Sequence, residues 1–305
     1  MVDLVAFGVI VDDIVYPDGE TWMGVLGGGG PQTAFGMRLW SPSIGIVAGI
    51  GEEFISTVEE WLIASGIDGS GLRESEEPTP RAWQLLEYDE RRRQVWRVPS
   101  DIIQKQLSRS IGYLPDTYRI AQGFHFGIHP DEPDQEFIEA LHDLNAVVSV
   151  EPFKPADKLP DRAVLREFLS KTDIFSANQL EAHSLVRGDE PLELAKRLVE
   201  AGANIVVLRL GTRGSLVLDG HTGAGFRVPA VPVEVRDPIG AGNAYCGGFL
   251  AGWIQTREIL TAGIYGSVSA SFLLEQVGVP VYSEELAAKS RARASSLQPL
   301  VERIT

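Results

Sequence analysis

Residues 237–249 read Asp237-Pro238-Ile239-Gly240-Ala241-Gly242-Asn243-Ala244-Tyr245-Cys246-Gly247-Gly248-Phe249, and they say more about the fold than any other stretch. Glycines and small residues form a turn, and the apolar run after them predicts a helix. The first amide groups of a helix have no partner within it and point toward one position, which suits an anion. The segment therefore predicts an anion-binding site at the start of a late helix. An ordinary loop-to-helix turn is the alternative.

Short apolar runs alternate with helical patterns along the rest of the chain. The apolar runs, which predict strands, lie at residues 4–11, 43–48, 146–150, 174–176 and 205–208. The helical patterns lie at residues 32–39, 54–64, 136–144, 162–169, 192–201, 259–276 and 284–297. Apolar runs between helices favour an α/β fold with a mostly parallel, doubly wound sheet that helices cover on both faces. Because we find no internal repeat and no low-complexity linker, we expect a single domain over residues 1–305.

Two stretches depart from this alternation and predict a small additional sheet. Residues 79–98 contain two runs with three aromatic residues, joined by a charged turn, which is typical of a hairpin. Residues 12–25 are rich in turn residues and add one or two strands. We expect these strands to form a β lid that closes over a site and excludes water. A plain surface hairpin and a homodimer contact through exposed aromatic residues are the alternatives.

The composition excludes several classes of protein. The chain carries a formal charge of −15 at pH 7, and no dense block of Lys and Arg provides a nucleic-acid-binding face. The single cysteine, Cys246, excludes an internal disulfide and fits a reducing compartment. No apolar stretch approaches the ~18 residues of a membrane helix, and the N-terminal residues lack the basic start of a signal peptide. We therefore expect a cytoplasmic protein without a membrane partner.

Two polar segments follow predicted strands. Residues 178–181, Asn-Gln-Leu-Glu, come after the run at 174–176 and open a helix. An Asn at the cap with an acid three residues later is typical of a capping box, and the same pair suits a hard cation that keeps several waters. Residues 209–214, Arg-Leu-Gly-Thr-Arg-Gly, end the run at 205–208 in a G-x-x-G turn. On these residues alone, a tight hairpin explains the turn.

The N-terminal part holds two carboxylates and a run of glycines. Asp12 and Asp13 lie at the end of the first apolar run, where a carboxylate can accept hydrogen bonds from the hydroxyl groups of a sugar. Turn initiation before Pro17 is the alternative for either residue. Residues 27–32, Gly-Gly-Gly-Gly-Pro-Gln, precede a predicted helix. Both features are candidates for a substrate site.

These segments occur in the order found in one enzyme family. The glycine run, Thr79-Pro80-Arg81, N-x-x-E, G-x-x-G and the run at 237–243 resemble the motifs of the ribokinase (PfkB-type carbohydrate kinase) family. Residues 27–36 look closer to the Mak32-like members than to ribokinase itself. The resemblance implies a ribokinase-like fold with a β lid. It also implies ATP-dependent phosphorylation of a hydroxyl group of a sugar or sugar-like molecule, with Mg²⁺.

The resemblance also assigns roles to individual residues. It implies an anion hole at Gly240, Ala241 and Gly242. It implies substrate binding at Asp13, Gly28, Gly29 and Gln32. It implies binding of the nucleotide and its Mg²⁺ at Asn178, Glu181, Arg209, Gly211, Thr212 and Gly214, with Glu181 acting on Mg²⁺ through water. A monovalent cation such as K⁺ is implied near Asp237.

One position departs from the family's signature. The Asp that serves as the family's catalytic base is Asn243 here. An amide accepts a hydrogen bond from a hydroxyl group but does not take its proton, and general-base assistance is typically worth about 10²–10⁴-fold in rate. The sequence leaves open a weakened kinase, a kinase in which Asp12, Asp13 or Asp237 reaches the hydroxyl, and a catalytically inactive nucleotide- or sugar-binding regulatory or scaffold protein.

Overall fold

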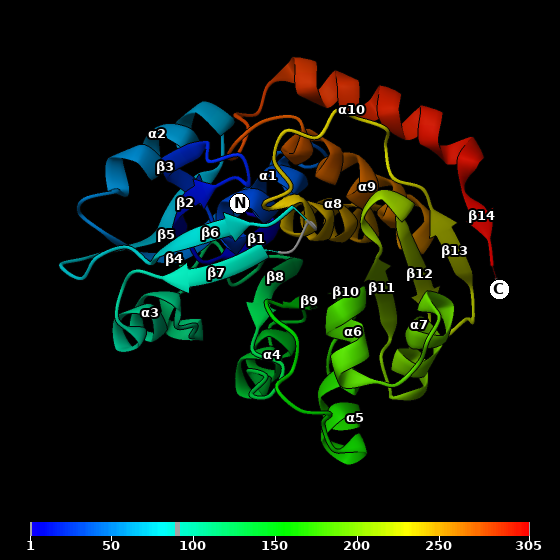
Figure 1. Cartoon of the computed structure of the whole chain (residues 1–305). Coiled ribbons are helices and arrows are strands. Elements are labelled where there is room, and N and C mark those ends of the chain that lie inside the picture. Colours follow the sequence, from blue (N-terminus) through cyan, green and yellow to red (C-terminus); the bar gives the residue numbers. More distant parts are fainter. Residues whose placement is uncertain (1, 89–91, 305) are drawn as a thin grey trace.

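The structure is a computed structural model that describes residues 2–88 and 92–304, and it contains one large and one small sheet (Figure 1). The large sheet runs, from one edge to the other, through β14 (Glu302–Arg303), β13 (Gly225–Val228), β12 (Ser215–Asp219), β11 (Ile205–Arg209), β10 (Ile174–Asn178), β9 (Val147–Pro152), β8 (Gly123–Ile128), β1 (Leu4–Phe7), β4 (Ile44–Gly51) and β5 (Asp68–Ser75). All neighbours from β5 to β11 pair in parallel, and β12, β13 and β14 add antiparallel strands at one edge.

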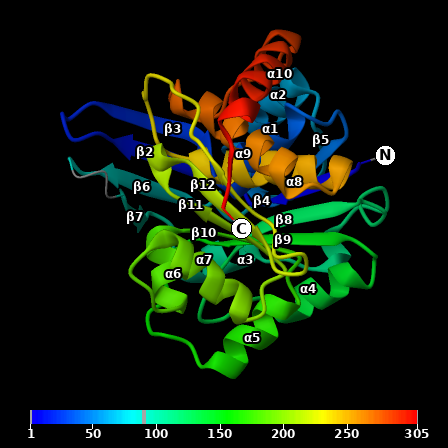
Figure 2. The same cartoon turned by 90° about the vertical axis from the view of Figure 1, so that its right-hand side faces the viewer.

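Helices cover both faces of the large sheet (Figure 2). One face carries α1 (Gly29–Arg38), α2 (Ile55–Ser65), α8 (Ala241–Thr256), α9 (Ile259–Leu274) and α10 (Glu284–Leu297). The other face carries α4 (Gln135–His142), α5 (Arg162–Ser170), α6 (Gln179–Leu185) and α7 (Pro191–Glu200). A buried hydrophobic cluster lies on each face, as expected for strands that are apolar on both sides. Among the described residues, no helix has the length and apolar character needed to cross a membrane.

The small sheet is the predicted lid. It contains, in order, β3 (Thr21–Gly27), β2 (Ile10–Val15), β6 (Arg81–Leu86) and β7 (Arg92–Trp96). Both predicted lid stretches therefore supply strands, although β2 begins two residues before residue 12 and β3 ends two residues after residue 25. The charged turn between β6 and β7 includes residues 89–91, which lie outside the described residues. The chain leaves the lid through α3 (Ser100–Leu107).

The prediction of one strand over residues 4–11 is wrong. Gly8 has a left-handed φ of 85°, which ends β1 and turns the chain toward β2 in the other sheet. The sequence shows no polar residue between the two strands, because both are largely buried, so the end of β1 could not be predicted. The ribokinase-like α/β architecture and the other predicted strands and helices are confirmed with small shifts at their ends. The sequence did not predict β5, β8, β13, β14 or α3.

Glycines allow α1 and α8 to pack with their backbones in contact. A Cβ atom added at Gly36 would lie 2.2 Å from the carbonyl oxygen of Ala244, and one added at Gly247 would lie 2.0 Å from that of Thr33. No other residue fits at such distances, so close packing of the two helices explains why positions 36 and 247 are glycine. The contact fixes the start of α8 relative to the start of α1.

This contact predicts the effect of adding one methyl group. Gly247→Ala should lower the free energy of unfolding by about 1–3 kcal/mol, because the new Cβ meets backbone that cannot move independently. Gly112→Ala is the control, since its Cβ would lie 3.5 Å from Ser110 Oγ, an ordinary contact. Urea unfolding of the three proteins measures the difference. Equal midpoints for Gly247→Ala and wild type would contradict the packing described here.

Candidate active site

The N-terminus of α8 presents unpaired backbone donors. Gly240 precedes the helix with a left-handed φ of 82°, and no side chain caps the helix. The first intrahelical bond runs from the amide of Ala244 to the carbonyl oxygen of Gly240, at 2.9 Å. The amide groups of Ala241, Gly242 and Asn243 therefore have no partner within the helix. All three residues are partly exposed, so a ligand anion can reach these donors.

Gln32 holds the side chain of Asn243. Gln32 is buried in α1, and its Oε1 accepts a hydrogen bond from Asn243 Nδ2 at 2.5 Å. The same side chain lies against Gly240, where an added Cβ would be 2.3 Å from Gln32 Cδ. Because Asn243 uses its nitrogen toward Gln32, its Oδ1 points elsewhere, and no described residue donates a hydrogen bond to it. The amide is thus oriented with a free acceptor at the start of α8.

Arg209 lies beside the same helix start. It ends β11, and a Cβ added at Gly242 would be 2.4 Å from its Nη1, so a larger residue there would displace the guanidinium. Arg209 Nη1 donates to Glu151 Oε2 at 2.5 Å, and Nη2 donates to Glu181 Oε2 at 3.4 Å. The Nε group is buried and has no partner among the described residues. An unpaired buried donor next to free amides fits an anionic ligand.

Buried charges around Arg209 shift one another's pKa values. Burial alone would raise the pKa of Glu151, but Arg209 and His125 outweigh it and lower that pKa to about 2. Burial raises the pKa of Glu181, although Arg209 opposes the rise. His125 Nε2 lies 3.3 Å from Glu151 Oε1, and its Nδ1 lies 2.9 Å from Ser149 Oγ. The carboxylate of Glu151 therefore stays ionised and holds the guanidinium of Arg209 in place.

The N-x-x-E segment forms the predicted capping box at α6. The amide of Asn178 donates to Glu181 Oε2 at 2.7 Å, and the amide of Glu181 donates to Asn178 Oδ1 at 2.9 Å. Asn178 Nδ2 also donates to Glu181 Oε1 at 2.7 Å. Both carboxylate oxygens of Glu181 thus have protein partners. A direct bond from Glu181 to a metal would break this cap, whereas a contact through water would not.

The G-x-x-G segment forms the predicted tight turn between β11 and β12. Gly211 and Gly214 have left-handed φ values of 60° and 78°, which explains the glycine at each position. Thr212 lies between them in a short 3-10 turn. The turn lies next to the start of α6, because Arg213 Nη2 donates to Gln179 Oε1 at 2.5 Å. The segments expected to bind nucleotide therefore meet at one edge of the large sheet.

Asp12 and Asp13 face opposite sides of the lid. Asp13 is fully buried and accepts hydrogen bonds from Arg81 at 2.7 Å, from the amide of Gly24 at 2.9 Å, and from Arg97. These groups lower its pKa although burial opposes the shift. The carboxylate that the resemblance assigns to substrate already has three partners, and its role there stays a prediction.

Asp12 lies on the side of the lid that faces α1. Its Oδ1 accepts from Gln84 Nε2 at 2.6 Å, and a Cβ added at Gly27 would lie 1.9 Å from its Oδ2. Gly27 leads directly into α1. Burial raises the pKa of Asp12 to about 7. We call the side that carries Asp12, Ala82 and Gln84 the inner face of the lid.

The remaining predicted residues surround this edge. Gly28 and Gly29 begin the turn into α1, and a Cβ added at Gly28 would lie 2.7 Å from the backbone nitrogen of Ile10. Asp237 is buried before α8 and accepts a hydrogen bond from the amide of Ile239 at 3.0 Å. Burial raises the pKa of Asp237 to about 6. Close backbone neighbours thus explain why both positions are glycine, and their contact with substrate stays a prediction.

Among the described residues, two groups of side chains have metal-ligand chemistry, and the charges around each disfavour a bound cation. His125, Glu151 and Cys246 offer ligand atoms within 4.8 Å of one another. The guanidinium of Arg209, 2.5 Å from Glu151 and 3.7 Å from Cys246 Sγ, repels a cation there, and burial raises the pKa of the thiol. The second group, His129, Asp131 and Asp157, lies nearer the surface, where Lys154 pairs with Asp157 at 2.9 Å.

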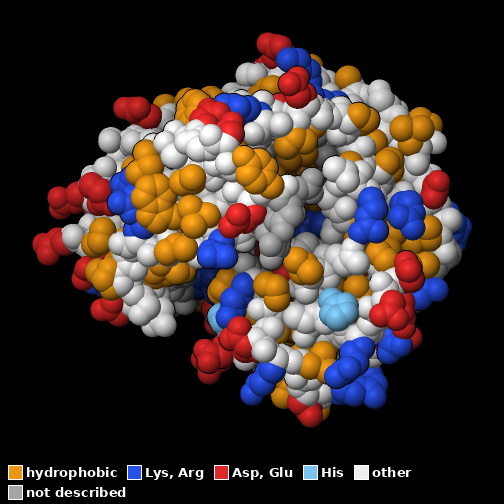
Figure 3. All heavy atoms as spheres, in the orientation of Figure 1, with side chains coloured by type: hydrophobic (Ala, Val, Ile, Leu, Met, Phe, Trp, Pro, Cys, Tyr) orange, Lys and Arg blue, Asp and Glu red, His pale blue; other side chains and the backbone are white. Residues whose placement is uncertain are grey.

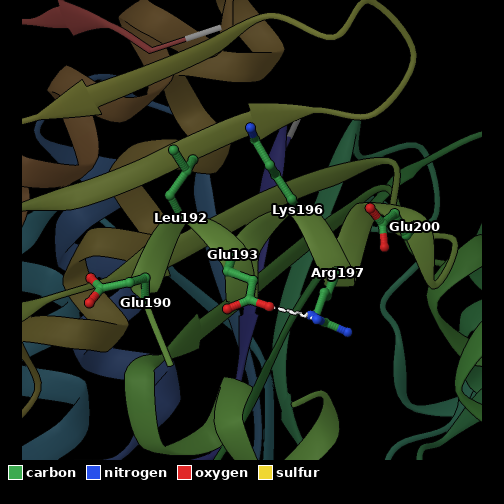
Figure 4. A pocket seen from close by; sticks show the side chains of 6 residues that line it. All are labelled: Glu190, Leu192, Glu193, Lys196, Arg197 and Glu200. Atoms are coloured by element: carbon green, nitrogen blue, oxygen red, sulfur yellow. Dashed lines mark hydrogen bonds and ion pairs between the residues drawn. The ribbon is translucent and has the colours of Figure 1, made fainter. Parts of the chain in front are cut away.

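A hollow beside the lid and a concavity along α7 differ in character. Figure 3 shows a hollow between the lid and the rest of the molecule, with Lys and Arg side chains at its rim. A second concavity runs along α7 (Figure 4) and is lined by Glu190, Leu192, Glu193, Lys196, Arg197 and Glu200. Its charged side chains come from one helix and its cap, and Glu193 pairs with Arg197 at 2.6 Å. None of the predicted site residues lines it, so we assign the site to the α8 edge.

Comparison with known proteins identifies the family. The pattern of the pfkB family of carbohydrate kinases matches residues 4–285, so the chain belongs to this family. It is 30% identical over 264 residues to a cytidine kinase from Thermococcus kodakarensis, covering 85% of this chain and 91% of that protein. It is 27% identical over 156 residues to the protein MAK32 from Saccharomyces cerevisiae, covering 45% of this chain and 43% of that protein.

Solved structures confirm the ribokinase-like fold. An adenosine kinase from Sinorhizobium meliloti superposes with a TM-score of 0.77 at 19% identity, covering 95% of this chain and 99% of that one. A ribokinase II from E. coli in complex with ATP and Mg²⁺ superposes with a TM-score of 0.74 at 17% identity, covering 96% of this chain and all of the other, 100%. At these identities the likeness supports the fold and says nothing further about this chain.

The charge network predicts a pH-dependent loss of stability in one variant. Arg209→Met leaves Glu151 and Glu181 buried without their cation, which should cost about 3–5 kcal/mol at neutral pH. In wild type the pKa of Glu151 is lowered to about 2 from 4.5, so its contribution is present above about pH 4.5 and lost as the pH falls toward 2. In the variant the pKa of the unpaired buried carboxyl rises above its ordinary value, so stability falls as the pH rises.

Urea unfolding between about pH 4 and pH 7 measures this difference. The gap between wild type and Arg209→Met should widen as the pH rises. Arg213→Met is the control, because its guanidinium is exposed and its loss should change stability by about 0.5 kcal/mol or less. A gap that stays constant with pH, or equal losses in the two variants, would contradict the network.

Proposed function

We propose that this chain transfers the γ-phosphoryl group of ATP to a hydroxyl group of a sugar or nucleoside, at a rate limited by Asn243. The observation that supports this best is the start of α8. Free amide groups, the guanidinium of Arg209 and the oriented amide of Asn243 meet there at a partly exposed position. Phosphoryl transfer depends mostly on positioning and on stabilising negative charge, and this arrangement supplies both.

In this proposal, the residues at the start of α8, Glu181 and the G-x-x-G turn have different roles. The amides of Ala241, Gly242 and Asn243 donate hydrogen bonds to the transferred group, and Arg209 Nε, which has no protein partner, donates a further one. Mg²⁺, when bound with ATP, neutralises charge on the phosphates. Glu181 acts on that ion through water, because its own oxygens are bonded to Asn178 and Arg209. Gly211, Thr212 and Gly214 allow the nucleotide to approach the sheet edge.

Asn243 positions the acceptor hydroxyl group without removing its proton. Gln32 takes the hydrogen bond from Asn243 Nδ2, which leaves Oδ1 as the acceptor for a substrate hydroxyl group. The orientation that a catalytic carboxylate provides is thereby retained, while its basicity is lost. This predicts turnover that is slow but not abolished.

The inner face of the lid supports a sugar-bearing acceptor. Asp12 pairs across β2 and β6 with Ala82, which pairs with Trp96 on β7. Paired residues share a face, so a carboxylate, a small residue and a partly exposed indole form one row. Such a row suits a ribose whose hydroxyl groups bond to Asp12 and whose base stacks on Trp96. The cytidine kinase relative makes a nucleoside the first acceptor to test.

A binding protein without turnover is the second candidate, and the amide at position 243 favours it. The donors at α8 and the charges around Arg209 do not depend on a base, so nucleotide binding survives the change to Asn. Such a protein would respond to nucleotide or sugar as a regulator or scaffold.

Four further features belong to the same proposal. We expect residues 1–305 to act as one domain, with the protein in the cytoplasm. The exposed lid aromatic Tyr88 is a candidate for a homodimer contact. A monovalent cation such as K⁺ near Asp237 would stabilise the loop before α8, where the buried carboxyl group accepts from Ile239.

The proposal predicts that one substitution increases activity. Asn243→Asp should raise kcat by about 10²–10⁴-fold, because it restores a general base at the oriented position. The side chain of Gln32 can turn to donate its Nε2 hydrogen to the new carboxylate. ATP consumption is measured with a panel of nucleosides and sugars, and Asn243→Leu, which has neither basicity nor a hydrogen bond, is the control.

The thermal shift with Mg-ATP separates the two candidates. A ligand that binds the folded state must stabilise it, so both candidates predict a rise in Tm. A rise without turnover in wild type or Asn243→Asp supports the binding protein. Absence of both turnover and any rise at saturating Mg-ATP would contradict the proposed function.

The pKa of Asp12 predicts how acceptor binding depends on pH. A raised pKa near 7 means that the carboxylate forms only as the pH rises through about 7, so kcat/KM for the acceptor should fall below this pH. In Asp12→Asn this step should disappear, whereas Asp13→Asn, whose carboxylate is ionised between two arginines, should retain it. The same profile in wild type and Asp12→Asn would rule out this role for Asp12.

A further inference from the structure

Strand β7 alternates between the two faces of the lid. Its register pairs Arg92 with Leu86, Gln94 with Gln84, and Trp96 with Ala82. Because Ala82 and Gln84 lie on the inner face, Arg92, Gln94 and Trp96 share that face. Arg93 and Val95 pair with Leu85 and Trp83 and therefore lie on the outer face. Two adjacent arginines thus point to opposite sides of the lid.

The inner face is the side of the lid that covers the site. Asp12, Ala82 and Gln84 are buried there, whereas Trp83 and Leu85 on the outer face are partly exposed. Asp12 also lies against Gly27, at the start of α1, and α1 carries Gln32 to Asn243. A side chain on the inner strand face of β7 is therefore directed toward the hollow beside α8.

The charge of Arg92 acts on both halves of the site. It lies close enough to lower the pKa of Asp12 on the lid and of Glu181 on α6, although burial raises both. The register that puts Arg92 on the inner face agrees with this effect and directs its guanidinium toward the edge of the large sheet. Arg92 is itself exposed, and no described residue forms a hydrogen bond or salt bridge with it. Within the described part of the chain it is therefore a cation without a partner, on the inner face of the lid.

Among the other described cations around the site, Arg213 at the turn between β11 and β12 donates to the neutral Gln179 at 2.5 Å, and the rest pair with carboxylates. Arg209 is held by Glu151 at 2.5 Å and by Glu181 at 3.4 Å, so its positive charge is already matched by two carboxyl groups. On the lid, Arg81 and Arg97 are bound to Asp13. At the start of α8, negative charge on a transferred phosphoryl group therefore meets amide dipoles and the guanidinium of Arg209, whose charge two carboxyl groups already match.

We propose that Arg92 is a catalytic residue of the lid, which donates hydrogen bonds to the phosphoryl group while it moves from ATP to the acceptor. This inference rests on the proposed function and adds a residue to it. The bond between the β–γ bridging oxygen and the γ-phosphorus breaks, its electron pair stays with ADP, and the acceptor oxygen bonds to phosphorus. The hydroxyl proton passes to a phosphoryl oxygen and then to water. Arg92 keeps its protons and stabilises the charge on the equatorial oxygens.

The adjacent arginine provides a matched control. Arg92→Ala should lower kcat about 10²-fold with little change in the KM for ATP, because the contact forms during transfer. Arg93→Ala removes the same charge from the neighbouring position on the outer face and should stay within about 2-fold of wild type. Arg92→Lys should fall between them, since it keeps the charge and loses the planar pair of donors. All are measured with the acceptor and the Asn243→Asp background that give the highest rate.

A binding measurement tests the same contact without turnover. Aluminium fluoride added to Mg-ADP mimics the transferred group, and it should raise the Tm of wild type and Arg93→Ala above the value with Mg-ADP alone. In Arg92→Ala the rise with Mg-ADP should remain, which shows a folded nucleotide site, while the additional rise should be lost.

The results of the two assays test the role of Arg92 separately from the proposed kinase function. If Arg92→Ala and Arg93→Ala behave alike in both assays while wild type binds nucleotide, the role of Arg92 is wrong and the proposed function stands. If wild type neither turns over nor binds Mg-ATP, the proposed function and the inference both fail.

Discussion

The backbone of α8 at its first turn is the feature on which the rest of this structure depends. A helix start leaves amide donors without partners, and here no side chain caps them. Gln32 fixes one side of this start through Asn243, and Arg209 fixes the other side next to Gly242. The close contact of α1 and α8 keeps these parts in register. The donors are therefore held in place before any ligand arrives, which is the condition for effective charge stabilisation.

The charged residues around this start serve two different purposes. Glu151, Arg209 and Glu181 form a buried chain that positions the guanidinium and closes the cap of α6. Asp13 with its two arginines stabilises the outer face of the lid. Buried ion pairs of this kind add little net stability, but loss of one partner is costly. Asp12, which accepts a hydrogen bond from Gln84, and Arg92, which has no partner among the described residues, lie on the inner face, where we propose that substrate binds.

The sequence predicted the fold class because it rests on local signals, and the same signals marked the segments that meet at the edge we propose as the site. Alternating apolar runs and helical patterns defined the sheet, and glycines at 240, 211 and 214 marked turns that only glycine adopts readily. The split between β1 and β2 escaped because buried strands from two sheets follow each other without a polar break. Three of the partners escaped because they lie more than 50 residues away along the chain: Arg81 for Asp13 (68 residues), Arg209 for Glu151 (58) and Gln32 for Asn243 (211). For Arg92, the alternation along residues 92–96 was a usable signal once the strand's inner face was known.

A structure of the protein with Mg²⁺ and a non-hydrolysable ATP analogue tests the central claim most directly. The account predicts the terminal phosphate within hydrogen-bonding distance of the amides of Ala241, Gly242 and Asn243, with Arg209 Nε directed toward the phosphates. A nucleotide bound elsewhere, for example along α7, with the start of α8 free of ligand, would contradict it.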